Sequence, residues 1–131
     1  MFDVLDYIPE TVAATGNGQA HNQQKLADVA AYKNLTDNWD EDGATAPDHL
    51  TIVVALDIAL LLIAHGQTIY HTSPGPAGEI MLNLRQGERS VEFLVYPNDK
   101  RKIVRVGGLG TPWQGMLTPE TLRESLQWLN S

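Results

Sequence analysis

One short acidic stretch holds the residue types most capable of binding an ion. Asn38, Asp40 and Asp42 have the spacing of the first, third and fifth ligands of a calcium-binding loop, and Gly43 follows where such a loop turns sharply. The first position should be an aspartate, however, and the twelfth, which should be a bidentate glutamate, is His49. We therefore expect no calcium binding at physiological levels.

The same stretch is a cluster of negative charge. Five acidic residues lie within twelve positions, with no lysine or arginine among them. A surface of one sign attracts a surface of the other and speeds their association. We therefore expect these residues to contact a protein partner with a basic surface, the alternative being ordinary solubilising charge. They are Asp37, Asp40, Glu41, Asp42 and Asp48.

No other set of residues forms a catalytic or cofactor-binding motif. The histidines lack the spacing of metal ligands, and the serines lack the motif of a catalytic nucleophile. The glycine-rich segment 107–110 lacks the Lys-Ser/Thr pair of a phosphate-binding loop. We expect no catalytic residue, no cofactor and no metal. The side chains considered are His21, His49, His65, His71, Ser73, Ser90 and Ser125.

The elements that position the acidic stretch begin with a helix. Residues 1–22 are predicted to be an N-terminal arm and a flexible connection, because positions 15–24 are mostly Gly, Asn, Gln and His. Residues 23–131 are then expected to form a single α+β domain. Apolar residues at helical spacing predict its first helix over 23–35.

A long apolar helix is expected after the loop 36–48. Pro47 and Asp48 suit its first turn, because proline lacks the N–H that is unpaired there and the acid complements the helix dipole. Gly66 is expected to end the helix in a left-handed conformation. Asp57 interrupts the apolar run and is expected to face solvent, whereas the rest of the helix should be central and buried.

Three alternating runs follow and predict a three-stranded antiparallel meander. They are Ile80–Arg85, Arg89–Tyr96 and Lys100–Val106, and the turns between them are short. A loop is expected over 107–117, and then a final amphipathic helix that starts at Thr118. The predicted order is α-α-β-β-β-α, with the sheet packed on the central apolar helix.

Six basic residues cluster near the two turns and the last predicted strand. Positive charge on an edge strand prevents it from pairing with other chains. We expect the cluster to protect this edge, the alternative being a docking patch. Its members are Arg85, Arg89, Lys100, Arg101, Lys102 and Arg105.

The composition of the chain argues against several classes of protein. The chain has 131 residues, 43% of them hydrophobic, and no cysteine, which excludes disulfides and thiolate zinc sites. The net charge of −7 disfavours binding to nucleic acid. The longest apolar run is too short to span a bilayer, and no secretory signal is expected. A soluble, cytoplasmic protein is predicted, and a homodimer is left open.

The acidic stretch and the elements after it resemble an uncharacterised family of small bacterial proteins. The resemblance covers about residues 36–106. It rests on Asn38-Trp39-Asp40-x-x-Gly43-Ala44, on the proline before the apolar helix, and on Pro74 or Pro76 leading to Gly78, Ile80 and Leu82. It implies a bacterial origin and structural roles for Trp39, docked under the helix, and for Gly43, in a tight turn. Trp39→Ala is then expected to destabilise the fold by about 3–5 kcal/mol.

These features favour a non-catalytic bacterial interaction or accessory protein, of the antitoxin, immunity or regulator kind. The alternative is a small-ligand or metal-binding domain, or an enzyme with an unrecognised motif, using the acidic loop 37–49. A pocket ringed by Asp40, Asp42 and His49 would favour the alternative.

Overall fold

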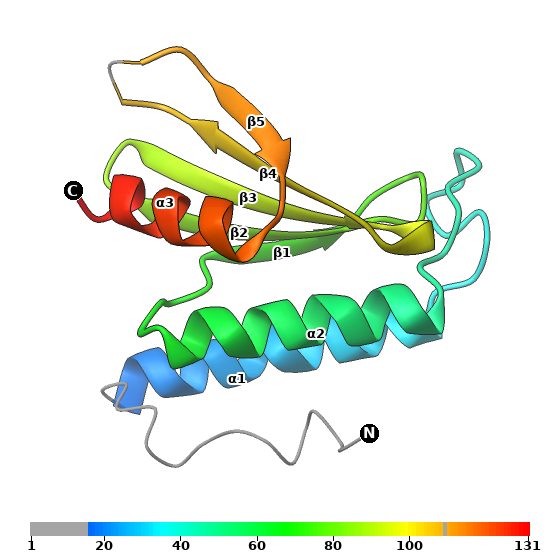
Figure 1. The fold of residues 1–131 in the computed structure, drawn as a ribbon. Coiled ribbons are helices and arrows are strands. Elements are labelled where there is room, and N and C mark those ends of the chain that lie inside the picture. Colours follow the sequence, from blue (N-terminus) through cyan, green and yellow to red (C-terminus); the bar gives the residue numbers. More distant parts are fainter. Residues whose placement is uncertain (1–15, 109) are drawn as a thin grey trace.

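The computed structural model describes residues 16–108 and 110–131 and has an α+β fold, as predicted (Figure 1). Three α-helices accompany one five-stranded sheet, and two short 3-10 helices, η2 and η3, lie in connections. The elements in order are α1 (Gly16–Ala31), η2 (Tyr32–Asn34), α2 (His49–Ala64), β1 (His71–Pro74), β2 (Ile80–Gln86), β3 (Arg89–Tyr96), η3 (Pro97–Asp99), β4 (Lys100–Val106), β5 (Trp113–Met116) and α3 (Pro119–Leu129).

The sheet is antiparallel throughout, with its strands in the order β1-β2-β3-β4-β5. The three predicted strands are its centre, β2 to β4, and their antiparallel pairing is confirmed. The predicted number of strands is wrong, because β1 and β5 add one strand at each edge. Each has four residues and includes Pro74 or Gly115, so neither has the alternating apolar pattern of an independent strand. Backbone pairing with the neighbouring strand defines them instead.

The core lies between the helices and one face of the sheet. Figure 1 shows all three helices on the same side of the sheet, with α1 and α2 running side by side. The side chains of the covered face alternate along β2, β3 and β4 with those of the opposite face. The buried set is Ile80, Leu82, Leu84, Val91, Phe93, Val95 and Ile103. On the opposite face, Met116 is 76% exposed and Val106 is 41% exposed.

Helix α1 differs from the prediction at both ends. It begins at Gly16, where a flexible connection was expected, and ends at Ala31 before the 3-10 helix η2. The prediction relied on apolar periodicity, whereas a polar residue anchors this part of the helix. The side chain of Asn22 accepts a hydrogen bond from the backbone N–H of Ile69 (2.9 Å) and donates one to the carbonyl of Gln67 (3.2 Å). The predicted arm, residues 1–15, lies outside the described residues.

Helix α2 is the predicted central helix. Asp48 caps it, accepting a hydrogen bond from the backbone N–H of Thr51 at 2.7 Å. Pro47 therefore precedes the cap and does not lie in the first turn. Gly66 ends the helix with a φ of +80°, and Asp57 is exposed, both as expected. Within the described ranges, no helix combines the length and the apolar character needed to cross a membrane.

The predicted role of the basic cluster is wrong, because β4 is not an edge strand. β5 pairs with it, and Arg101 and Arg105 lie on the helix-covered face beside Ile103. The guanidinium of Arg105 lies 4.0 Å from the ring centre of Trp113, and its Nε donates to the buried Ser125 hydroxyl at 2.9 Å. This arginine joins β4, β5 and α3.

Candidate functional site

The acidic loop is closed by its own side chains. Asn38 Oδ1 accepts a hydrogen bond from the N–H of Gly43 at 2.7 Å. Asp40 Oδ1 accepts two more, from the N–H groups of Asp42 (2.9 Å) and Ala44 (3.0 Å). Gly43 has a φ of +86°, a left-handed conformation that glycine adopts without strain, which agrees with the predicted tight turn. Short polar side chains thus accept hydrogen bonds from loop N–H groups that have no partner in a helix or a sheet.

Two further carboxylates fasten the end of the loop. Asp37 Oδ1 accepts a hydrogen bond from the N–H of Ala46 at 3.0 Å, across nine residues of sequence. Asp48 caps α2 through Thr51, as described above. The loop is therefore held at its base and at the start of the helix that follows it.

These hydrogen bonds lower the pKa of two of the carboxyl groups. For Asp40 the main causes are the donors from Ala44 and Asp42, and for Asp48 they are the hydroxyl and the N–H of Thr51. A lowered pKa means that the ionised form stabilises the fold above the ordinary pKa of about 3.9. That contribution is lost as the pH falls through the lowered values.

Two acidic residues of the loop have a different environment. Glu41 and Asp42 are exposed, and their carboxylates make no hydrogen bond or ion pair with the described part of the chain. The five acids therefore divide into three whose carboxylates accept hydrogen bonds from the backbone (Asp37, Asp40 and Asp48) and two whose carboxylates accept none within the described part of the chain.

The loop also docks on the connection between β1 and β2. The indole of Trp39 is half-buried, and its Nε1 donates to the carbonyl of Thr45 at 3.2 Å. The N–H of Thr45 in turn donates to the carbonyl of Pro76 at 2.9 Å. Gly78 has a φ of +80° and lies next to the loop, because a Cβ there would be 3.5 Å from the carbonyl oxygen of Ala46 and 3.2 Å from the ring of Pro97. The loop is thus fixed to the body of the domain.

Trp39→Ala is expected to lower the free energy of unfolding by about 1–3 kcal/mol, less than the sequence alone suggests. The indole is half-buried and is not among the side chains of the core, so its removal loses one hydrogen bond and part of an apolar contact. Urea unfolding measures this value. Trp39→Phe is the matched control, which keeps an aromatic ring but no N–H. A loss above about 4 kcal/mol would mean that the ring is a core residue.

The geometry bears on the calcium hypothesis. Asn38 and Asp40, the first and third candidate ligands, already accept hydrogen bonds from the loop. We expect titration calorimetry with calcium chloride to give no heat of binding at micromolar concentrations, because the position-twelve carboxylate is missing. His49→Glu, which supplies a carboxylate at position twelve, is the matched comparison. Micromolar binding by the unsubstituted chain would contradict the expectation.

The structure does not gather the histidines into one site. Within residues 16–108 and 110–131, no three or more His, Asp or Glu side chains could hold a metal ion together. His21 Nε2 lies 2.7 Å from the carbonyl of Ile69, and His65 caps the end of α2. His49 begins α2 and His71 begins β1, and both are exposed.

The candidate serines and glycines have structural surroundings. Ser125 is buried and accepts the hydrogen bond from Arg105, whereas Ser73 and Ser90 lie in β1 and β3. Gly107 has a φ of +97°, and a Cβ there would collide with the carbonyl of Glu88. This glycine permits the close approach of two backbones.

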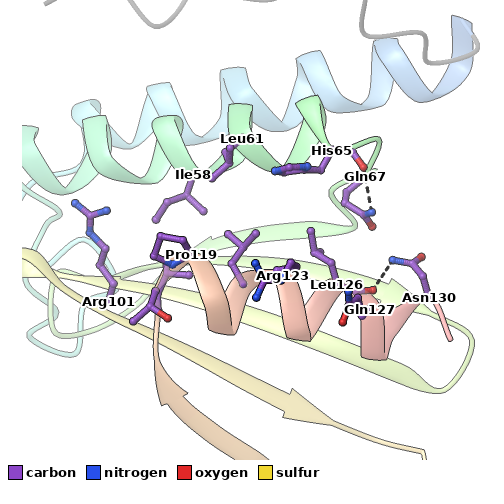
Figure 2. Close-up of a pocket in the computed structure, with 13 residues that line it drawn as sticks. Ile58, Leu61, His65, Gln67, Arg101, Pro119, Arg123, Leu126, Gln127 and Asn130 are labelled. Atoms are coloured by element: carbon purple, nitrogen blue, oxygen red, sulfur yellow. Dashed lines mark hydrogen bonds between the residues drawn. The ribbon is translucent and has the colours of Figure 1, made fainter.

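A groove of about 720 Å³ lies away from the acidic loop, between α2 and α3 (Figure 2). Its apolar residues include Ile58 and Leu61 from α2 and Leu122 and Leu126 from α3. Figure 2 shows the side chain of Ile58 extending from α2 toward α3, and that of Leu126 extending from α3 toward α2. Leu61 is 45% exposed, so the groove opens to solvent. Its volume lies within the range of small-molecule and peptide sites.

Comparison of the chain with models of protein families, with curated proteins and with solved structures found no match. The resemblance to a bacterial family therefore stays a prediction.

Sequence reasoning missed the groove because it treated the leucines of the last helix alike. Leu122 and Leu129 are buried, as is Ser125 between them, and these three residues share one face of α3. Leu126 lies beside that face, half-buried at the groove. The i, i+3, i+7 spacing of 122, 125 and 129 is the signal that could have separated the two roles.

Proposed function

We propose that this chain is a non-catalytic interaction domain that binds a basic protein surface through the exposed carboxylates of Glu41 and Asp42. The proposal rests on one observation. The carboxylates of Asp37, Asp40 and Asp48 accept hydrogen bonds from the backbone, whereas those of Glu41 and Asp42 accept none from the described residues and lie exposed on a backbone that the other three hold in place. A rigid loop loses little conformational entropy on binding, which favours affinity.

Charge supports the same proposal. No Lys or Arg of the described chain forms an ion pair with any of the five acids of the loop, so their field is not neutralised internally. Such a field raises the rate of encounter with a cationic surface and repels phosphate backbones. Leu50, at the start of α2, is 60% exposed and supplies an apolar contact at the end of the same segment. A bacterial origin and a cytoplasmic location are part of the proposal.

The alternative, a ligand or metal site built on residues 37–49, has less support. The groove between α2 and α3 and two smaller hollows are all lined by residues outside this loop. The acids and His49 therefore do not surround any of these three cavities.

Site-specific photo-crosslinking in the source cells tests the proposal. A benzoylphenylalanine at position 42, which replaces one of the two carboxylates and leaves Glu41 to hold the partner, is expected to capture a discrete protein. The same probe at Glu88, an exposed acid in the turn between β2 and β3, is the matched control and is expected to capture none. Equal capture at both positions, or none at position 42, would contradict the proposal.

The purified partner then permits a kinetic test. Glu41→Gln combined with Asp42→Asn is expected to slow association by about fivefold or more at low salt, because two charges that steer the encounter are removed. Glu88→Gln should leave the rate unchanged. Added salt should reduce the rate of the unsubstituted chain more than that of the double variant. An association rate that responds to neither the substitutions nor salt rules out steering by this loop.

A further inference from the structure

The groove between α2 and α3 has apolar walls. α3 packs on the sheet through Leu122, Ser125 and Leu129, and this leaves Leu126 half-buried at the groove. α2 contributes Leu61, which is 45% exposed. Apolar side chains that line a groove and stay in contact with water favour an apolar occupant.

The charged residues of the groove are basic. Its thirteen described lining residues include Arg101 and Arg123 and no aspartate or glutamate, in a chain whose net charge is −7. Arg123 makes no ion pair with the described residues. Arg101 donates from Nε and Nη2 to Asp99, which leaves Nη1 without a partner among those residues. The acidic residues of the two helices do not line the groove; they are Asp57, Glu120 and Glu124. The groove therefore complements an anionic group.

The direction of the two helices shows where that anionic group belongs. Figure 2 shows His65 and Asn130, which follow the last residues of α2 and α3, at one end of the groove. Arg101 and Pro119 lie at the opposite end. The C-terminal end of a helix carries partial negative charge and its N-terminal end partial positive charge. Both helices thus disfavour an anion at His65, and the start of α3 adds to the positive charge of Arg101.

The size of the groove favours a small molecule over a protein. Its volume of about 720 Å³ lies within the range of small-ligand pockets, about 300–1,000 Å³. A stable protein interface needs about 800 Å² from each partner, whereas the lining residues cover only about two turns of α2 and three of α3. From Ile58 to His65 the groove follows about 10 Å of helix, at about 1.5 Å per residue. An extended alkyl chain of about eight to ten carbons, with bonds of about 1.5 Å, has this length.

We propose that the α2–α3 groove binds a medium-chain carboxylate, an alkyl chain of about eight to ten carbons with one anionic end. The carboxylate lies at the end formed by Arg101 and the first turns of α3, which include Arg123. The planar guanidinium groups match its two oxygens. The chain extends toward His65 and covers Leu61 and Leu126. This site is separate from the acidic loop, so either proposal can fail without the other.

An NMR titration of the methyl-labelled chain measures affinity and location together. The probes are sodium octanoate, octylammonium chloride, which has the same chain and the opposite charge, and sodium butanoate, whose chain is shorter. All are used below the concentrations at which they form micelles. Octanoate is expected to shift the methyl resonances of Leu61 and Leu126 and to leave unchanged those of Val106, which lies on the opposite face of the sheet. It should bind at least about tenfold more tightly than either of the other probes.

Each other result of this titration overturns part of the proposal. Equal affinity for octanoate and octylammonium removes the anionic end, and equal affinity for octanoate and butanoate removes the apolar walls. Shifts at Val106 instead of Leu61 place the binding elsewhere. No saturable shift with octanoate overturns the site itself.

Two pairs of variants assign the contacts. Arg123→Gln is expected to weaken octanoate binding by about fivefold but not that of octylammonium. Its matched control is Lys33→Gln, an equal change of charge at an exposed residue of η2. If the two variants bind octanoate equally, Arg123 is not its counter-ion.

The second pair concerns the apolar wall. Leu61→Ser is expected to weaken octanoate binding by about fivefold or more, whereas Val106→Ser, at a residue 41% exposed, should leave it unchanged. Because both side chains are partly exposed, the fold should survive, which circular dichroism checks. Equal binding by the two variants removes Leu61 from the site.

Sedimentation of the chain without ligand tests for a protein occupant. The proposal leaves the groove open to solvent in the absence of ligand. A dimer that Leu61→Ser dissociates and Val106→Ser does not would show that a second copy of the chain covers the groove. That result overturns the small-ligand site.

Discussion

Phe93→Ala is expected to lower the free energy of unfolding by about 3–5 kcal/mol, the range for a large aromatic removed from a core. Phe93 is fully buried in the central strand β3, directly opposite Leu82 of β2 and Ile103 of β4, which are also buried. All of these side chains lie on the face covered by the helices. Truncation leaves a cavity that rigid neighbours on two strands cannot fill.

The neighbouring residue Leu94 is the matched control. It lies in the same strand, and its side chain belongs to the opposite face, where it is half-buried. Leu94→Ala is expected to cost about 1 kcal/mol or less. Urea unfolding of both variants measures the difference. Similar losses for the two would contradict a sheet whose helices cover one face.

That contrast concerns the part of the fold that the sequence predicts well. A strand in the middle of a sheet must alternate buried and exposed side chains, and this period is visible in residues 80–106 without any structure. The ends of α2 and α3 are predictable for a similar reason. Asp48, Gly66 and Thr118 act on backbone groups a few residues away, so the signal is local.

The edge strands β1 and β5 were not predicted, because their cause is not local. Each is defined by backbone hydrogen bonds to the next strand, and backbone donors are the same for every residue but proline. The role of the arginines was misassigned for the same reason. Once β5 covers β4, Arg105 lies between Trp113 and Ser125, residues eight and twenty positions away.

The sequence located the acidic loop but did not show which of its carboxylates hold the backbone and which remain free of hydrogen bonds. Five carboxylates in twelve positions look equivalent in the sequence. Which of them bind backbone N–H groups depends on the φ and ψ angles of the loop, including a left-handed Gly43. The groove could not be predicted from the sequence at all, because it is formed by the positions that α2 and α3 take on the sheet.

Asn22→Ala is expected to lower the free energy of unfolding by about 2–4 kcal/mol, a large effect for a polar residue. Asn22 is only 3% exposed, and its amide joins α1 to residues 67–69 through two hydrogen bonds. Removing the side chain leaves the buried N–H of Ile69 without its partner, which costs about 1–3 kcal/mol, and the part-buried carbonyl of Gln67 loses its partner at a smaller cost. Urea unfolding measures the loss.

Two further substitutions separate the effect of the amide's hydrogen bonds on the free energy of unfolding from the effect of helix propensity. Gln23→Ala changes the exposed neighbour and is expected to stay within about 0.5 kcal/mol of the unsubstituted chain. Asn22→Asp keeps the acceptor for Ile69 but sets a buried carboxylate oxygen against the carbonyl oxygen of Gln67, so at neutral pH we expect a loss at least as large as that of Asn22→Ala. The same amide holds Gln67, which lines the end of the groove. If Asn22→Ala proves as stable as Gln23→Ala, α1 is not anchored by this residue.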